Sequence, residues 1–206
     1  MRSFFDSDIL KKLVENELDS SLDKLTPEQK IEACAQQIIK ALGLNKDSEE
    51  LLETPFRIAK MYYKELFSSI NKEPDVKLTS FKSNYEHYIT MTGIPYYSVC
   101  SHHFMPFFGT VDIAYFPKNE DSKVLGLSKF PRLVKFFSRK PQVQEDFTQE
   151  LAKYIYEQLK PEGVLIRVTG YHTCVASRGA EVEAKVTTEA MLGNIDKNEV
   201  LHLWKA

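Results

Sequence analysis

Two short segments rich in cysteine and histidine constrain this chain more than any other feature of its sequence. They are Cys100-Ser101-His102-His103 and His172-Thr173-Cys174, and both are embedded in β-branched and aromatic sequence rather than in Gly/Ser-rich linkers. Thiolates and neutral imidazoles are ligands that zinc prefers in proteins. The sequence therefore predicts a metal site at which these two segments meet.

The spacing within the segments limits how many ligands they supply. In the first segment only one or two residues can easily bind an ion that Cys174 also binds, so we expect three protein ligands and one spare histidine on each segment. Three ligands plus water are the pattern of a catalytic zinc site, where the metal lowers the pKa of water to about 7. The spare imidazoles could then act as general acid and base.

Two other interpretations of these residues stay open on spacing alone. Asp112, His87 or a spare histidine could supply a fourth ligand, which would make the zinc structural. The cysteines could also be plain core residues, because a buried free cysteine packs like a small hydrophobic side chain.

The composition indicates a globular protein in a reducing compartment. Of the 206 residues 43% are hydrophobic, which is enough for a substantial core, and the net charge of −2 argues against broad nucleic-acid binding. Three cysteines at these spacings do not suggest a disulfide framework. The N-terminal residues turn acidic before any apolar core of a signal peptide develops, and no apolar run has the ~18–20 residues of a membrane helix. We expect a soluble, cytoplasmic protein without nucleic-acid or membrane partners.

Residues 1–75 are predicted to form an N-terminal helical region. Thr26, Pro27 and Gln29 form a helix start with a capping box, and Gly43 ends that helix. A second helix should begin at Thr54-Pro55 and continue to about Ser68. Three apolar stripes are expected to be buried: Ile9, Leu10, Leu13 and Leu18; Ile31, Cys34, Ile38 and Leu42; and Ile58, Met61, Tyr62 and Leu66. Cys34 is thereby predicted to be a packing residue, whereas Arg57, Lys60 and Lys64 form a basic stripe that would be solvated.

Residues 76–206 are predicted to form a second domain that contains the sheet. Strands are expected over 77–81, 87–100, 107–116, 163–175 and 182–191, with a turn over 118–123 and helices from Ser128 and over 144–159. The order of strands and helices favours an α+β fold with an antiparallel sheet. Alternation over 163–175 would place His172 and Cys174 on the same face of one strand. Lys129 and Arg132 lie at the positive end of a helix dipole, which is a common phosphate site.

Six segments in this order resemble the GTP cyclohydrolase I family, over about residues 27–195. They are E-T-P-F-R-I-A-K-M at 53–61, C-S-H-H-F at 100–104, G-L-S-K-F-P-R at 126–132, R-K-P-Q-V-Q-E at 139–145, H-T-C-V-A-S-R-G at 172–179 and T-T-E-A-M-L-G at 187–193. The resemblance implies a tunnelling fold (T-fold): an antiparallel sheet with two helices on one face, plus the N-terminal helical extension. It also implies a homodecamer of two stacked pentamers, with active sites between subunits.

The resemblance assigns roles to individual residues of this chain. Cys100, His103 and Cys174 would bind Zn2+, and His102 and His172 would be catalytic. Glu145 would bind the guanine edge of GTP, with Gln144 and Ser128 as nearby substrate contacts. The cations that would bind the triphosphate are Lys60, Lys129, Arg132, Arg178 and Arg57.

The same resemblance implies the first step of pterin and folate synthesis. His172 would protonate N7 of the purine, water would add to C8, and a second hydrolysis would release formate while His102 helps to move protons. Ring closure would then give 7,8-dihydroneopterin triphosphate.

The chain departs from the family pattern at a few positions. Ser101 stands where the family usually has glutamate, Asp146 stands where arginine is common, and Glu189 lies in a Thr/Ser-rich stretch. Loss of a carboxylate beside a metal can change its tuning. The rival interpretations are a T-fold enzyme acting on a pterin or deazapurine, and a catalytically altered paralogue that binds a purine nucleotide.

Overall fold

The computed structural model describes residues 24–117 and 123–204 of the chain. They belong to two compact units, one within residues 1–65 and one within residues 66–206. The predicted stripe of Ile9, Leu10, Leu13 and Leu18 and nearly all of the predicted turn over 118–123 lie outside the described residues. The predicted division into domains at residue 75 stays a prediction.

The first unit begins with helix α3, Pro27–Ala41, which starts and ends where the sequence predicts. Its capping box is formed: Gln29 N–H donates to Thr26 Oγ1 at 3.3 Å, and Thr26 N–H donates to Gln29 Oε1 at 2.9 Å. These bonds satisfy backbone donors that a helix start leaves without partners. Gly43 follows the helix with φ of 70°, a conformation that glycine adopts without strain.

The predicted buried face of α3 is wrong. Cys34 is exposed, and Ile38 and Leu42 are 60% and 68% exposed, whereas Ala35 and Ile39 are buried. Helix α3 packs against α4, Thr54–Lys60, whose own buried residues are Pro55 and Ala59. Small residues at this contact let the two helix backbones approach closely. A prediction based on the spacing of large apolar residues overlooks such small residues.

Helix α4 changes its winding before its predicted end. After Lys60 the chain continues as the π-helix η2, Met61–Leu66, so the expected helix to about Ser68 is split into two kinds of helix. Of its predicted apolar stripe, Ile58, Tyr62 and Leu66 are partly buried and Met61 is exposed.

The second unit is built on a five-stranded sheet with the order β5-β2-β3-β6-β7. Its strands are β2 Ile89–Cys100, β3 Pro106–Phe116, β5 Pro141–Gln142, β6 Gly163–His172 and β7 Lys185–Gly193. All neighbouring pairs are antiparallel except β2 and the short β5. Strands β1 Ser80–Lys82 and β4 Lys123–Leu125 form a separate two-stranded sheet.

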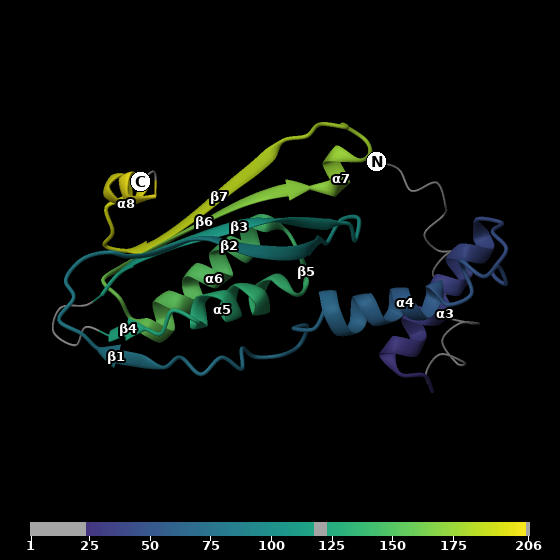
Figure 1. Ribbon diagram of the computed structural model, residues 1–206, viewed down its shortest axis with the longest axis horizontal. Coiled ribbons are helices and arrows are strands. Elements are labelled where there is room, and N and C mark those ends of the chain that lie inside the picture. Colours follow the sequence, from purple (N-terminus) through teal and green to yellow (C-terminus); the bar gives the residue numbers. More distant parts are fainter. Residues whose placement is uncertain (1–23, 118–122, 205–206) are drawn as a thin grey trace, which may run out of the picture. The chain divides into compact units, whose positions relative to one another are not determined.

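Two helices cover one face of the main sheet (Figure 1). They are α5, Lys129–Ser138, and α6, Gln144–Leu159, both close to their predicted bounds. The predicted inward residues of both helices lie in one core with the sheet: Phe130, Leu133, Val134 and Phe137 of α5, and Phe147, Leu151, Ile155 and Leu159 of α6. The predicted α+β fold with two helices on one face of an antiparallel sheet is therefore confirmed.

The opposite face of the sheet carries a smaller core. Helix α8, Lys197–Leu203, which the sequence did not predict, contributes Val200 to a cluster with Ala114 and Leu165. None of the described helices is long and apolar enough to cross a membrane.

The prediction of a strand over residues 163–175 is wrong at its end. Strand β6 stops at His172, and Thr173–Ala176 form the short helix α7. The register explains the change, because His172 pairs with Phe107 at the start of β3, and β7 begins opposite Tyr171. Beyond His172 the backbone has no neighbouring strand to bond, so the chain closes a helical turn instead.

The register also defines the two ends of the sheet. At what we call the histidine end, Phe107 pairs with His172; at the far end, Tyr115 pairs with Val164. Tyr115 lies eight positions after Phe107 in β3, which corresponds to roughly 26 Å along the strand.

Candidate metal centre

Three side chains from distant parts of the second unit converge at the histidine end of the sheet. The ligand atoms of Cys100, His103 and Cys174 all lie within 4.8 Å of one another, and among the described residues this is the group that could hold a metal ion. Cys100 and Cys174 are 6% and 8% exposed, whereas His103 is exposed. The structure thus brings together the three residues predicted as ligands.

A tight loop after β2 presents the two neighbouring histidines. Cys100 N–H donates to Met105 O at 2.8 Å, and Phe104 N–H donates to Cys100 O at 2.9 Å. Phe104 adopts a left-handed φ of 52°, which closes the loop. His102 turns back on the same cysteine, with Nδ1 3.7 Å from Cys100 Sγ. His102 therefore lies beside the three-residue group without being a member of it.

Cys174 reaches the group because α7 turns the chain out of β6. Thr173 Oγ1 donates to Pro106 O at 2.6 Å, which ties the first residue of α7 to the start of β3. Burial raises the pKa of the Cys174 thiol, as does the neighbouring Cys100, while the positive charge of Arg178 acts in the opposite direction.

The donor set fits a zinc ion. Two thiols and one imidazole converge at a distance suited to a shared ion, and they are the soft and borderline donors that zinc selects. A bound cation would favour the thiolate form that the raised pKa of Cys174 otherwise opposes.

His172 lies next to this group and has its own partners. Its ring stacks on Phe107 with centroids 4.7 Å apart and planes 6° from parallel, and its Nε2 is 2.9 Å from Gln144 Oε1. Burial lowers the pKa of His172, and the negative charge of Glu145 raises it in part. The electrostatic effects of Glu145 on His172 and of Arg178 on Cys174 place both of these predicted residues near the centre.

The phosphate-binding residues predicted on α5 lie elsewhere in the unit. Leu125 N–H donates to Tyr115 Oη at 3.0 Å, which fixes β4 at the far end of the sheet. Ser128, Lys129 and Arg132 follow in the next residues, at the start of α5. Figure 1 shows β4 and α7 at opposite ends of the sheet. Within one chain these three residues and the metal group are therefore not neighbours.

The remaining predicted cations belong to the first unit. Arg57 and Lys60 are exposed residues of α4, and Arg57 Nη1 pairs with Glu53 Oε2 at 3.3 Å. Their proposed role in triphosphate binding stays a prediction.

The side chains considered as a fourth ligand have other surroundings. Asp112 Oδ1 accepts from Gly93 N–H at 2.8 Å, at a shift in the β2–β3 register, and His87 packs against Tyr85. Neither belongs to the metal-ligating group.

Several residues around His172 carried no signal in the sequence. A polar cluster around Gln144 is formed by Tyr96, Thr148 and Thr188. In the sequence these three residues look like ordinary strand and helix residues. Gly170 carried a weak signal, because a glycine within a strand often marks a close approach of other atoms.

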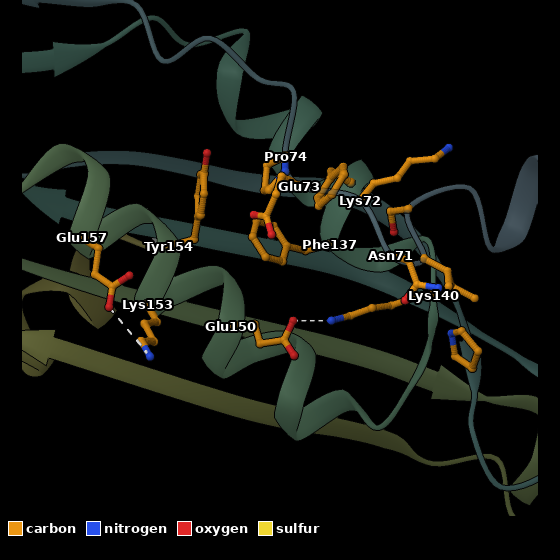
Figure 2. Close-up of a pocket in the computed structure, with 14 residues that line it drawn as sticks. Asn71, Lys72, Glu73, Pro74, Phe137, Lys140, Glu150, Lys153, Tyr154 and Glu157 are labelled. Atoms are coloured by element: carbon orange, nitrogen blue, oxygen red, sulfur yellow. Dashed lines mark hydrogen bonds and ion pairs between the residues drawn. The ribbon is translucent and has the colours of Figure 1, made fainter.

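One pocket of the second unit has no part in this centre. It has a volume of about 480 Å3, and Figure 2 shows it between the 69–74 segment and residues of α5 and α6. Lys140 pairs with Glu150 on its wall, and Lys153 lies 3.8 Å from Glu157. None of the predicted site residues lines it.

A family model and individual homologues of the chain indicate the same protein family. The family model described as GTP cyclohydrolase I matches residues 31–203. GTP cyclohydrolase 1 of Streptococcus agalactiae serotype Ia is 37% identical over 84% of this chain and 91% of its own length. The homologue from Streptococcus mutans serotype c is also 37% identical, over 85% of this chain and 90% of that protein.

Two further comparisons differ in coverage. The bifunctional protein FolKE of Lactococcus lactis subsp. lactis is 40% identical over 89% of this chain, and the chain spans only 53% of that protein. The apo archaeosine synthase QueF-Like structure has a TM-score of 0.42 and 18% identity, over 53% of this chain and 96% of that one.

Proposed function

Because the chain belongs to the GTP cyclohydrolase I family of enzymes, we propose that it hydrolyses the imidazole ring of GTP, releases formate and forms 7,8-dihydroneopterin triphosphate. The observation that carries the proposal is the convergence of Cys100, His103 and Cys174 beside two histidines outside that group. Three ligands with titratable groups beside them are the arrangement of a hydrolytic metal site rather than a structural one.

A zinc ion held by Cys100, His103 and Cys174 would act as a Lewis acid that makes water nucleophilic near neutral pH. His172 would give a proton to N7 of the purine, which makes C8 electrophilic. His102, next to Cys100, would move protons in the hydrolysis that releases formate. The stacking of His172 on Phe107 supports its role, because a fixed ring presents its nitrogens in a constant direction.

Binding of GTP would use a carboxylate and several cations. The guanine N1–H and 2-amino group are adjacent donors, and Glu145 could accept from both. The triphosphate would require several of Lys60, Lys129, Arg132, Arg178 and Arg57. Ser101, in place of the usual family glutamate, leaves this set of residues intact.

We further propose that each active site is shared between subunits of a homodecamer. Lys129 and Arg132 begin α5 at the far end of the sheet, whereas Arg178 and the metal group lie at the histidine end. Phe107 and Tyr115, which mark these two ends of the sheet, lie roughly 26 Å apart along β3, farther than one triphosphate extends. A second copy of the chain could bring its α5 start to the histidine end.

The proposal is tested by formate release from GTP with purified, zinc-replete protein. Formate together with a fluorescent pterin after oxidation is expected, and a chelator-treated sample should produce neither. Absence of formate from protein that retains zinc would contradict the proposal and favour an altered paralogue that binds a purine nucleotide.

A further inference from the structure

The carboxamide of Gln144 is enclosed in the core directly beside His172. Gln144 is the first residue of α6 and is 1% exposed. Its Nε2 lies 3.1 Å from each of three acceptors, Val168 O, Val186 O and Thr188 Oγ1. Its Oε1 lies 2.9 Å from His172 Nε2 and 3.4 Å from the Tyr96 hydroxyl. Both ends of the amide are thus occupied by protein groups.

The surroundings determine which way this amide faces. Backbone carbonyl oxygens only accept hydrogen bonds, so the end of the side chain facing Val168 O and Val186 O must be the NH2 group. The oxygen therefore faces His172, and because an amide oxygen only accepts, Nε2 of His172 must carry a hydrogen. The tautomer of the ring follows from the chemistry of its partners.

The hydroxyl groups around Gln144 are consistent with this direction. Thr148 Oγ1 donates to Gln144 O at 2.7 Å, so its hydrogen is used there. Thr188 Oγ1, 2.6 Å from Thr148 Oγ1, must then be the donor of that pair. Its lone pairs remain free to accept from Gln144 Nε2, whose two hydrogens are shared among its three acceptors.

We propose that Gln144 is a positioning residue: it holds His172 in the Nε2–H tautomer, so that Nδ1 is the nitrogen that exchanges a proton with the substrate. This role rests on the proposed function of His172 and differs from a substrate contact by the Gln144 side chain. Two further features support it. The stacking on Phe107 fixes the plane of the ring, and Gly170 leaves the space that the carboxamide occupies.

The kinetic test replaces Gln144 with methionine, which keeps the length of the side chain and removes the acceptor. We expect kcat to fall by about 10- to 100-fold, as is typical when the partner that orients a histidine is lost. The KM for GTP should stay within about threefold, because an interaction that only positions a catalytic group does not contribute to ground-state binding. A KM that rises while kcat is unchanged would overturn the proposal in favour of substrate contact.

Gln142 offers a matched control two residues earlier in the chain. It is also buried, and its Nε2 donates to Ser98 Oγ at 3.1 Å and to Phe137 O at 2.7 Å, away from His172. Gln142→Met should lower the melting temperature as Gln144→Met does, and should change kcat less than about threefold. An equal loss of kcat in both variants would assign the effect to a disturbed core and overturn the proposal.

A second measurement needs neither activity nor a core variant. Solid-state NMR can report which nitrogen of His172 is protonated. The sample is the zinc-loaded wild-type chain with 15N-labelled histidine, at a pH at which the ring is neutral. The His172 signals are identified among those of the five histidines by their loss in His172→Ala. We expect the hydrogen on Nε2, and its location on Nδ1 would overturn the proposal. If the wild type releases no formate, the proposed function fails, and this spectrum still decides the tautomer.

Discussion

Gly170 shows how one missing side chain shapes the centre. A Cβ atom at this position would lie 2.2 Å from Gln144 Oε1 and 2.5 Å from the Tyr96 hydroxyl. Real Cβ contacts are never this short, so Gly170→Ala must displace the cluster that touches His172. We expect it to destabilise the fold by about 1–3 kcal/mol, as overpacking of a core does, and to lower kcat.

Urea unfolding of the variant measures the first effect, with Gly126→Ala as control. A Cβ atom at Gly126 meets no atom closer than 3.6 Å, so that substitution should change the free energy of unfolding by less than about 0.5 kcal/mol. Equal stabilities of the two variants would show that the cluster yields without strain.

The two kinds of cysteine in the chain provide a test of the metal site. Cys174 is buried in the group that could hold a metal ion, whereas Cys34 is exposed on α3. Cys174→Ala removes one of three protein ligands, so zinc content after gel filtration should fall from about one ion per chain to near zero. Cys34→Ala should retain the wild-type content. Retention of zinc by Cys174→Ala would show that the ion is held elsewhere.

Charged side chains link strands β6 and β7 on the face of the sheet that carries α8. Arg167 Nε and Nη2 donate to Glu189 Oε1 at 3.0 and 2.9 Å, and Lys197 of α8 bonds to Oε2 of the same carboxylate. Burial alone would raise the pKa of Glu189, but the hydrogen bonds and charges of Lys197 and Arg167 outweigh it and lower the pKa. Glu189 thereby connects two strands and the C-terminal helix.

Because the pKa of Glu189 is lowered, the stabilisation that its ion pairs with Arg167 and Lys197 provide depends on pH. Its contribution to stability is present above the ordinary glutamate pKa of 4.5 and is lost as the pH falls through the lower value in the folded state. Glu189→Gln should therefore cost about 1 kcal/mol near pH 7, as partly exposed ion pairs do, and progressively less below pH 4.5. Denaturant unfolding of both proteins at several pH values measures the difference. A difference that grows toward acid pH would refute the assignment.

For the assembled oligomer, the proposed sharing of active sites between subunits predicts how mixtures of variant chains behave. His172→Ala and Arg132→Ala chains should each be inactive alone. If the two residues of one site come from different subunits, co-refolded equal mixtures should regain activity at about one quarter of the sites, because each site then combines its two residues at random. Mixtures that stay inactive would place both residues in the same subunit.

A matched pair of variants controls this experiment. His172 and Cys174 lie next to each other in one chain and contribute to the same end of the sheet. Mixtures of His172→Ala and Cys174→Ala chains should therefore stay inactive, since no rearrangement of subunits unites the two intact residues in one site. Activity in this mixture would contradict the proposed arrangement, because it would mean that His172 and Cys174 of one site come from different subunits.

Several features were predictable because they depend on local patterns and on the chemistry of side chains. The capping box at Thr26, the bounds of α6 and its inward stripe follow from local rules of helix formation. The donor chemistry of the two Cys/His segments predicted a metal site, and the family resemblance, not the spacing, selected Cys100, His103 and Cys174 as its ligands. The α+β class followed from the segregation of helix-like and strand-like segments into separate runs along the chain.

Other features depend on what packs against each segment, and these could not be predicted from local patterns. The burial of Ala35 and Ile39 in place of Cys34 and Ile38 results from the contact with α4, because the pattern of α3 alone admits either face. The end of β6 at His172 results from the ends of its neighbours β3 and β7, and this turn carries Cys174 to Cys100. The direction of the Gln144 amide is likewise set by carbonyl groups of β6 and β7, which belong to distant parts of the sequence.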